Sequence, residues 1–87
     1  MAHRIFDVKV AKVDIGATKL VIKRKKAKEG KVRYLKTVFV MDSCTLITDK
    51  DNETLTPSDI KVGNRVTIDF MKTKDRKLLA KGISILT

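Results

Sequence analysis

A chain of 87 residues with 20 Lys and Arg against 10 Asp and Glu has room for one small domain, residues 1–87, and carries a formal net charge of +10. At this length only about 60 to 65% of the surface of the unfolded chain can be buried, which excludes a multidomain enzyme. Val, Ile, Leu and Phe number 27 of the 87 residues. This share is above the roughly 20% below which disorder is expected, so we expect a folded core.

No stretch approaches the roughly 18 consecutive apolar residues of a membrane-spanning helix, and charged residues interrupt the start of the chain. We therefore expect neither a span nor a signal peptide, and a cytoplasmic protein, or an extracytoplasmic one if a signal peptide has been trimmed. A monomer is favoured. Cys44 has no second cysteine to pair with, and His3 is the only histidine. We expect a buried, inert thiol, no metal site and no cofactor.

The first half of the chain predicts a meander of three strands. Apolar residues alternate on even numbers through Phe6, Val8 and Val10 and then on odd numbers at Val13 and Ile15, which predicts a β-bulge near positions 11 and 12. Residues 16–18 predict a hairpin turn, after which residues 19–26 begin apolar and end basic. Residues 28–31 predict the next turn, with a positive φ at its glycine, and residues 32–41 the third strand.

The second half begins with a segment of different charge. Residues 42–64 carry a net charge of −3, whereas residues 1–41 carry +9 and residues 65–87 carry +4. We expect a very short strand at residues 46–48, a polar loop at 49–53 and a helical turn at 56–60, because Thr56 is a good N-cap, Pro57 suits the first helical position and Asp59 the third. A final hairpin follows, with a strand at 65–71, a polar turn at 72–77 and a last strand in which Leu79, Ile83 and Ile85 face inward on odd numbers.

Five or six short strands in so small a chain bury a core most effectively as a barrel, which also removes exposed sheet edges. A meander, a helical turn near residues 56–62 and a closing hairpin follow the strand order of an OB-like barrel. We therefore predict an all-β, five- or six-stranded OB-like barrel, with an SH3-like barrel as the alternative. The predicted core consists of Val8, Val10, Val13, Leu20, Ile22, Val38, Val40, Val66, Ile68, Phe70, Ile83 and Ile85.

The stretch LTPSDIKVGNRVTIDFMKTKDRKLLAKGISIL, residues 55–86, resembles small bacterial OB-like barrel domains of unknown function. Those domains have an L-x-V-G-D-x-V segment entering a strand and a hairpin ending in L-x-A-x-x-I. The residues that fall on that pattern are Ile60, Val62, Gly63, Val66, Leu79 (or Leu78), Ala80 and Ile83. Asn64 replaces the usual aspartate. The resemblance implies the fold and no activity.

The strongest functional signal is a basic hairpin at residues 23–36, which holds eight cations in 14 residues against one carboxylate, Glu29. A phosphate backbone would relieve their repulsion and release counterions. Tyr34 and Phe39 lie on the same hairpin and could stack on bases. Because the apolar alternation around Phe6, Phe39 and Phe70 marks these residues as core, only Tyr34 is a fair stacking candidate. The alternative is a solvated, lysine-rich edge that prevents sheet-to-sheet aggregation. The predicted nucleic-acid-binding cations are Lys23, Arg24, Lys25, Lys26, Lys28, Lys31, Arg33 and Lys36.

A second basic cluster occupies the last hairpin, with Lys72, Lys74, Arg76 and Lys77 as its predicted binding residues. In an OB-like barrel this loop lies beside the binding face, so both basic segments are expected to line one groove. Lysine outnumbers arginine 15 to 5, which favours phosphate neutralisation over base reading and predicts weak sequence preference.

Metal binding and catalysis find little support in the sequence. Asp49, Asp51 and Glu53 have the spacing of oxygen ligands, but the glycine and the distal glutamate of an EF-hand loop are missing. No nucleophile with a base and no phosphate-binding glycine loop can be assembled. We expect no enzyme but a non-catalytic barrel that binds single-stranded DNA or RNA or another polyanion. The alternative is a structural or protein-interaction module with a solubilising basic surface.

Overall fold

The structure is a computed structural model that describes residues 2–87. Three long strands come first, short elements follow in the middle of the chain, and two strands of eight residues end it. In order, the elements are β1 (Ala2–Asp14), β2 (Lys19–Lys28), β3 (Lys31–Val40), β4 (Leu46–Thr48), β5 (Thr54–Leu55), the 3₁₀ helix η1 (Pro57–Asp59), β6 (Arg65–Lys72) and β7 (Leu78–Ile85). No helix in residues 2–87 is both long and apolar enough to cross a membrane.

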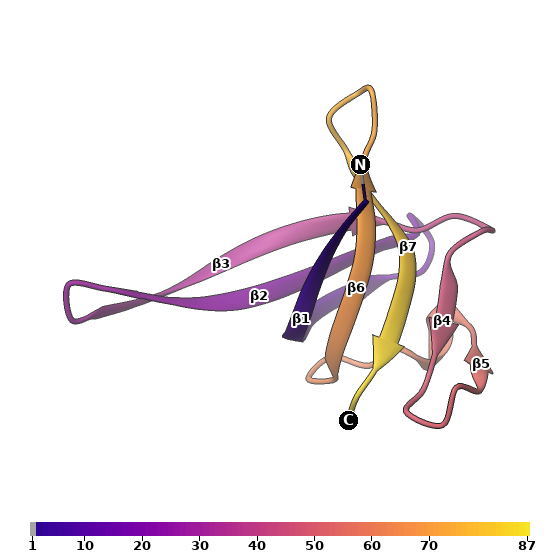
Figure 1. Ribbon diagram of the computed structural model, residues 1–87, viewed down its shortest axis with the longest axis horizontal. Helices are drawn as coiled ribbons and strands as arrows, with labels where there is room; N and C mark the ends of the chain where they lie inside the picture. The colour runs from indigo at the N-terminus through magenta and orange to yellow at the C-terminus, as the bar shows by residue number, and fades with distance from the viewer. Residues whose placement is uncertain (1) are drawn as a thin grey trace.

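All strands belong to one sheet with the order β3-β2-β1-β6-β7-β4-β5 (Figure 1). The sheet closes because β3 also pairs with β7, in parallel, at Val40 and Leu79. Five strands therefore form the barrel, and the short β4 and β5 extend it beside β7. The helical turn lies between the third and fourth barrel strands, where it was predicted.

Most of the predicted core is buried. Val8, Val10, Leu20, Ile22, Val66, Ile68 and Ile83 are each at most 6% exposed, and Val13, Phe70 and Ile85 pack against them half-buried. The β-bulge predicted near residue 11 is present, because the pairing of β1 with β2 shifts between Val10 and Lys12. Phe39 is buried as well, and the core further contains four residues that were not predicted, namely Met41, Ile47, Ile60 and Ala80.

The predicted phase of β3 is wrong. Val38 is 47% exposed, whereas Phe39 is fully buried, and Val40 is only half-buried. The pairing register explains the difference, because Phe39 lies opposite the buried Leu20 and so faces the core. Residues 38–41 are all apolar, so their alternation could not show which of them point inward.

Two further strands differ from their predicted phase. Phe6, expected to face inward, is 67% exposed, because the pairing of β1 with β6 shifts between Ile5 and Val8. Ile15, also expected to face inward, is 52% exposed and lies just beyond the end of β1. On β7 the pairing with β6 shifts at one residue, so that Leu78 and Ala80 face inward in place of Leu79. In both strands one extra residue puts the side chains before it on the opposite face from the one predicted, whereas those after it face as predicted.

The helical turn begins as predicted, with Thr56 as its N-cap, Pro57 at its first position and Asp59 at its third. Asp59 accepts hydrogen bonds from the backbone N–H and the hydroxyl of Thr56, at 2.8 and 3.1 Å. The hydrogen bond from the backbone N–H of Thr56 is the main cause of a lowered pKa of Asp59, and the bond from the Thr56 hydroxyl adds to it. The predicted buried Cys44 is instead exposed, because it lies in the turn between β3 and β4, where its backbone N–H donates to Asp42 at 2.8 Å.

Candidate nucleic-acid interface

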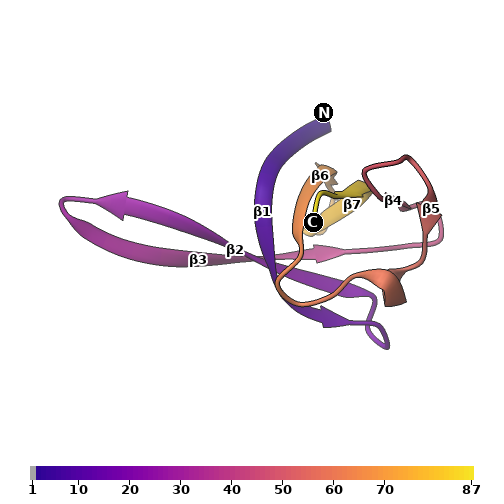
Figure 2. The same cartoon turned by 90° about the horizontal axis from the view of Figure 1, so that it is seen from below.

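The basic hairpin projects from the barrel as a free ribbon. β2 and β3 pair without interruption from Lys19 opposite Val40 to Lys28 opposite Lys31, whereas β1 pairs with β2 only as far as Lys23. Beyond that point residues 24–35, which we call the arm, have no third strand beside them, and all of them are exposed. Figures 1 and 2 both show the arm extending away from the other strands.

A two-residue turn closes the arm. Glu29 and Gly30 both have positive φ angles, 55° and 75°. Two consecutive residues of this kind match the right-handed twist of a hairpin. The positive φ predicted for the glycine is therefore confirmed, and its neighbour shares it. The turn allows the two strands to stay paired up to their last residues.

Like charges face each other along the hairpin. Three cross-strand pairs join two cations directly: Lys23 with Lys36, Lys26 with Arg33, and Lys28 with Lys31. Such pairs are destabilising in a sheet. The ion pairs within residues 2–87 are Arg4–Asp69, Arg65–Asp7 and Lys77–Asp75, so none of them neutralises a cation of the basic hairpin.

The two faces of the arm differ in chemistry. Because paired residues share a face and faces alternate along a strand, Lys25 and Tyr34 lie on the same side as Lys23 and Lys36. Tyr34 is 61% exposed, and the Lys23 Nζ lies 5.5 Å from the centre of its ring. Phe39 is buried, as its apolar surroundings indicated, and packs edge-on against Phe70, so it is not available to a base.

The opposite face of the arm carries cations almost alone. It surrounds a hollow of about 380 Å³ that Glu29 and Leu35 also line. The cations of this face are Arg24, Lys26, Lys28, Lys31 and Arg33, and all of them except Arg24 line the hollow.

Part of the second basic cluster lies next to the base of the hairpin. Lys72 ends β6, and the remaining predicted residues lie in or beside the β6–β7 turn. Arg76 and Lys77 line a hollow of about 390 Å³ together with Lys19 and Lys36. The structure therefore brings these two residues of the second cluster to the first one, while Lys72 and Lys74 do not line that hollow.

The acidic loop has a structural arrangement of its own. The Asp49 carboxylate accepts hydrogen bonds from the backbone N–H groups of Asp51 and Glu53, at 2.8 and 3.0 Å. This is the side-chain-to-backbone pattern of a polar turn. Within residues 2–87 no three His, Cys, Asp or Glu side chains gather as a metal site requires.

Sequence reasoning missed a second aromatic residue at the base of the arm. A hollow of about 630 Å³ lies where β1 leaves β2; we call it the notch, and its lining includes Phe6, Lys9, Lys23, Arg24, Lys25 and Tyr34. Phe6 was assigned to the core because it alternates with Val8 and Val10. The one available signal was Asp7, a residue that tolerates positive φ, inside the apolar alternation.

Comparison with solved structures supports the fold. No protein-family model and no curated protein matches the sequence. CusF with bound Ag(I) aligns with a TM-score of 0.69 and 16% identity over 99% of both chains. The fold is an OB-like barrel. A tryptophan-to-alanine variant of CusF from Escherichia coli with Cu(II) aligns with a TM-score of 0.68 and 16% identity, over 99% of this chain and 92% of that one.

A sequence identity of 16% to these CusF structures shows that the fold is shared and nothing more. The all-β OB-like barrel predicted from the strand order is thus confirmed. The resemblance of residues 55–86 to bacterial domains of unknown function stays a prediction.

Proposed function

We propose that this chain is a non-catalytic polyanion-binding barrel that binds single-stranded nucleic acid along its arm with weak sequence preference. The observation that carries the proposal is the arm itself. Its cations are exposed, they face each other across the ribbon, and none of them forms an ion pair with a carboxylate of residues 2–87. A line of phosphates would relieve this repulsion and release its own condensed counterions.

The chemistry of the side chains supports backbone binding over base reading. Lysine outnumbers arginine 15 to 5, and its ammonium is a hydrated point charge without the fork that reads guanine. The exposed ring of Tyr34 lies among Lys23, Lys25 and Lys36 on one face. Stacking on such a ring requires an unpaired base, which favours single strands over duplexes.

CusF was crystallised with Ag(I) or Cu(II), so the metal-binding potential of this chain bears on the choice. Soft metals prefer thiolate, thioether and imidazole ligands. Here Cys44 is exposed in a turn, and His3 stacks on Phe70 at 5.4 Å between ring centres. Within residues 2–87 no three His, Cys, Asp or Glu side chains gather, whereas the arm gathers cations without ion-pair partners, so the proposal concerns polyanions.

The test is a salt titration with a matched charge control. Affinity of the parent for a fluorescent single-stranded 20-mer is measured by anisotropy at several NaCl concentrations, with duplex of equal length as comparison. The arm variant combines Arg24→Gln, Lys25→Gln and Lys26→Gln in the arm with Lys23→Gln at its base. The control removes four exposed cations elsewhere, by Lys12→Gln, Lys50→Gln, Lys61→Gln and Lys81→Gln, so both variants lose the same net charge.

The expected difference lies in the slope of log Kd against log salt concentration. Each neutralised phosphate of a single strand contributes about 0.7 to this slope, so the arm variant should lower it by about two or more. The control should lower it by much less, since its charges lie outside the hairpin. If the parent shows no binding at low salt, or if both variants change the slope equally, the arm is a solvated edge and the interaction-module alternative is correct.

A further inference from the structure

The notch has a large apolar ring at its edge where burial would be expected. Phe6 is 67% exposed, although it belongs to a strand whose neighbouring residues Ile5 and Val8 contribute to the core. Burial of such a side chain stabilises the folded state, and the exposed ring gives up this contribution. The local structure therefore holds the ring out against the hydrophobic effect.

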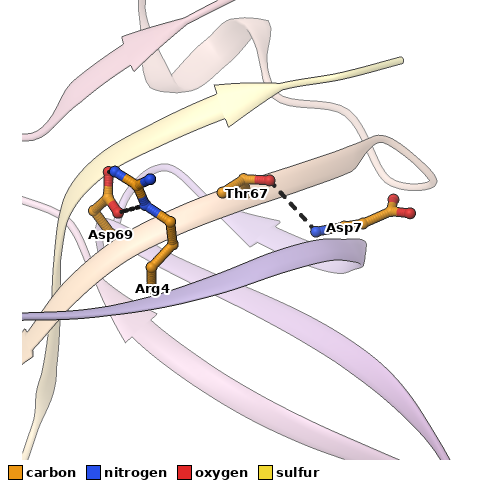
Figure 3. A network of polar contacts seen from close by, with 4 residues as sticks. All are labelled: Arg4, Asp7, Thr67 and Asp69. Atoms are coloured by element: carbon orange, nitrogen blue, oxygen red, sulfur yellow. Dashed lines mark hydrogen bonds and ion pairs between the residues drawn. The ribbon is translucent and has the colours of Figure 1, made fainter.

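A bulge at Asp7 causes this exposure, and polar contacts hold it in place. Asp7 has a φ of 52°, in the left-handed region that non-glycine residues rarely adopt. Its carboxylate forms a two-point ion pair with Arg65, which also lowers the pKa of Asp7, and its backbone N–H donates to the Thr67 hydroxyl at 3.4 Å. Figure 3 shows this backbone contact beside the ion pair of Arg4 with Asp69.

Arg4 also contacts the exposed ring directly. Its guanidinium carbon lies 5.8 Å from the centre of the Phe6 ring, within the range of a cation–π contact. The ring is thus supported from its own strand at positions 4 and 7. Backbone strain that neighbouring contacts hold in place is typical of ligand-binding positions.

The notch is positively charged and contains a second aromatic ring. Lys9, Lys23, Arg24 and Lys25 line it together with Tyr34, and its one carboxylate, Asp7, is already paired with Arg65. Its volume of about 630 Å³ lies within the range of small-ligand sites, about 300 to 1,000 Å³. Two exposed rings among four unpaired cations match a ligand with a flat apolar part and an adjacent negative charge.

We infer that the notch binds one unpaired nucleobase of the nucleic acid that lies along the arm. Phe6 and Tyr34 are the surfaces on which this base stacks, and Lys9 and Lys25 bind the neighbouring phosphate. This inference rests on the proposed function and adds a base-binding site to it. The cations of the arm bind the backbone in any sequence, whereas the notch requires a base. Free sugar-phosphate of the same charge is therefore a weaker ligand at this site.

The chain offers an intrinsic probe for this test. Tyr34 is the only tyrosine and there is no tryptophan, so tyrosine emission reports on the surroundings of this one ring, where the arm meets the notch. A single-stranded oligothymidylate is compared with an abasic oligomer of equal length and charge, with correction for ligand absorption. The base-bearing strand should quench the emission and bind more tightly, whereas the abasic strand should bind with the same salt slope and little quenching.

Variants of Phe6 then test the second ring. Phe6→Ala should weaken binding of oligothymidylate about 5- to 150-fold, the effect of losing one stacking platform, and leave abasic binding and the salt slope unchanged. Phe6→Tyr should restore affinity. Val62→Ala, which shortens another exposed apolar residue, serves as the control. Phe6→Leu keeps the apolar bulk without the ring and replaces Phe6→Ala if circular dichroism shows that variant unfolded.

The outcomes separate this inference from the proposed function. If salt-dependent binding is present but the parent binds both strands equally, or Phe6→Ala binds like the parent, the base site is refuted while backbone binding by the arm stands. If salt-dependent binding itself is missing, the proposed function fails first.

Discussion

Truncation of Ile68 to alanine tests the strand phases on which the barrel depends. Ile68 is fully buried on β6, between Ile5 on β1 and Ile83 on β7. Ile68→Ala removes three carbon groups, worth roughly 0.8 kcal/mol each by transfer from water, or about 2.4 kcal/mol. The cavity left behind adds to this, so we expect a loss of about 2 to 5 kcal/mol in the free energy of unfolding.

The matched control is Val38→Ala on β3. It removes two carbon groups from a side chain that is 47% exposed, so only about half of their transfer energy is lost, roughly 0.8 kcal/mol. Urea unfolding followed by far-UV circular dichroism measures both values. An 87-residue domain has about 4 to 13 kcal/mol of stability in total. If Ile68→Ala proves unfolded, Ile68→Val, expected at about 0.5 to 1.5 kcal/mol, takes its place.

A loss below about 1 kcal/mol for Ile68→Ala would contradict the assigned phase of β6. Equal losses for the two alanine variants would contradict the phase of β3, because the sequence alone placed both residues in the core.

Two further predictions concern single polar groups. The Arg65 ion pair lowers the pKa of Asp7 in the folded state, so its stabilisation is fully present above the unfolded aspartate pKa, about 3.9, and is lost as the pH falls through the lower folded value. Asp7→Asn should therefore reduce stability at pH 7 and flatten its decline below about pH 4; urea titrations with an unchanged pH profile would contradict this. Cys44 is exposed, so a thiol reagent should label it without unfolding, at a rate that urea below the transition hardly changes. Labelling only as fast as the protein unfolds would show that the thiol is covered.

The basic hairpin shows what sequence reasoning can and cannot locate at the candidate site. Its charge density, its glycine turn and its exposure follow from local residue order, because a run of cations has to stay in solvent. The sequence could not show that the hairpin stands free of β1 beyond Lys23, nor that Arg76 and Lys77 approach its base. Both facts depend on contacts between residues far apart in the chain.

The sequence by itself determined the class of the protein: an all-β barrel of short strands with a helical turn at residues 57–59, because turn residues and alternation act over a few neighbours. The tertiary structure alone decided which face of β3 points inward, since four consecutive apolar residues carry no alternation and the pairing of Phe39 with Leu20 sets the phase. It alone also turned Phe6 outward, because the bulge at Asp7 is held by Arg65 and Thr67 from β6. A strand's phase is a cooperative property of its partners, and one extra residue reverses it.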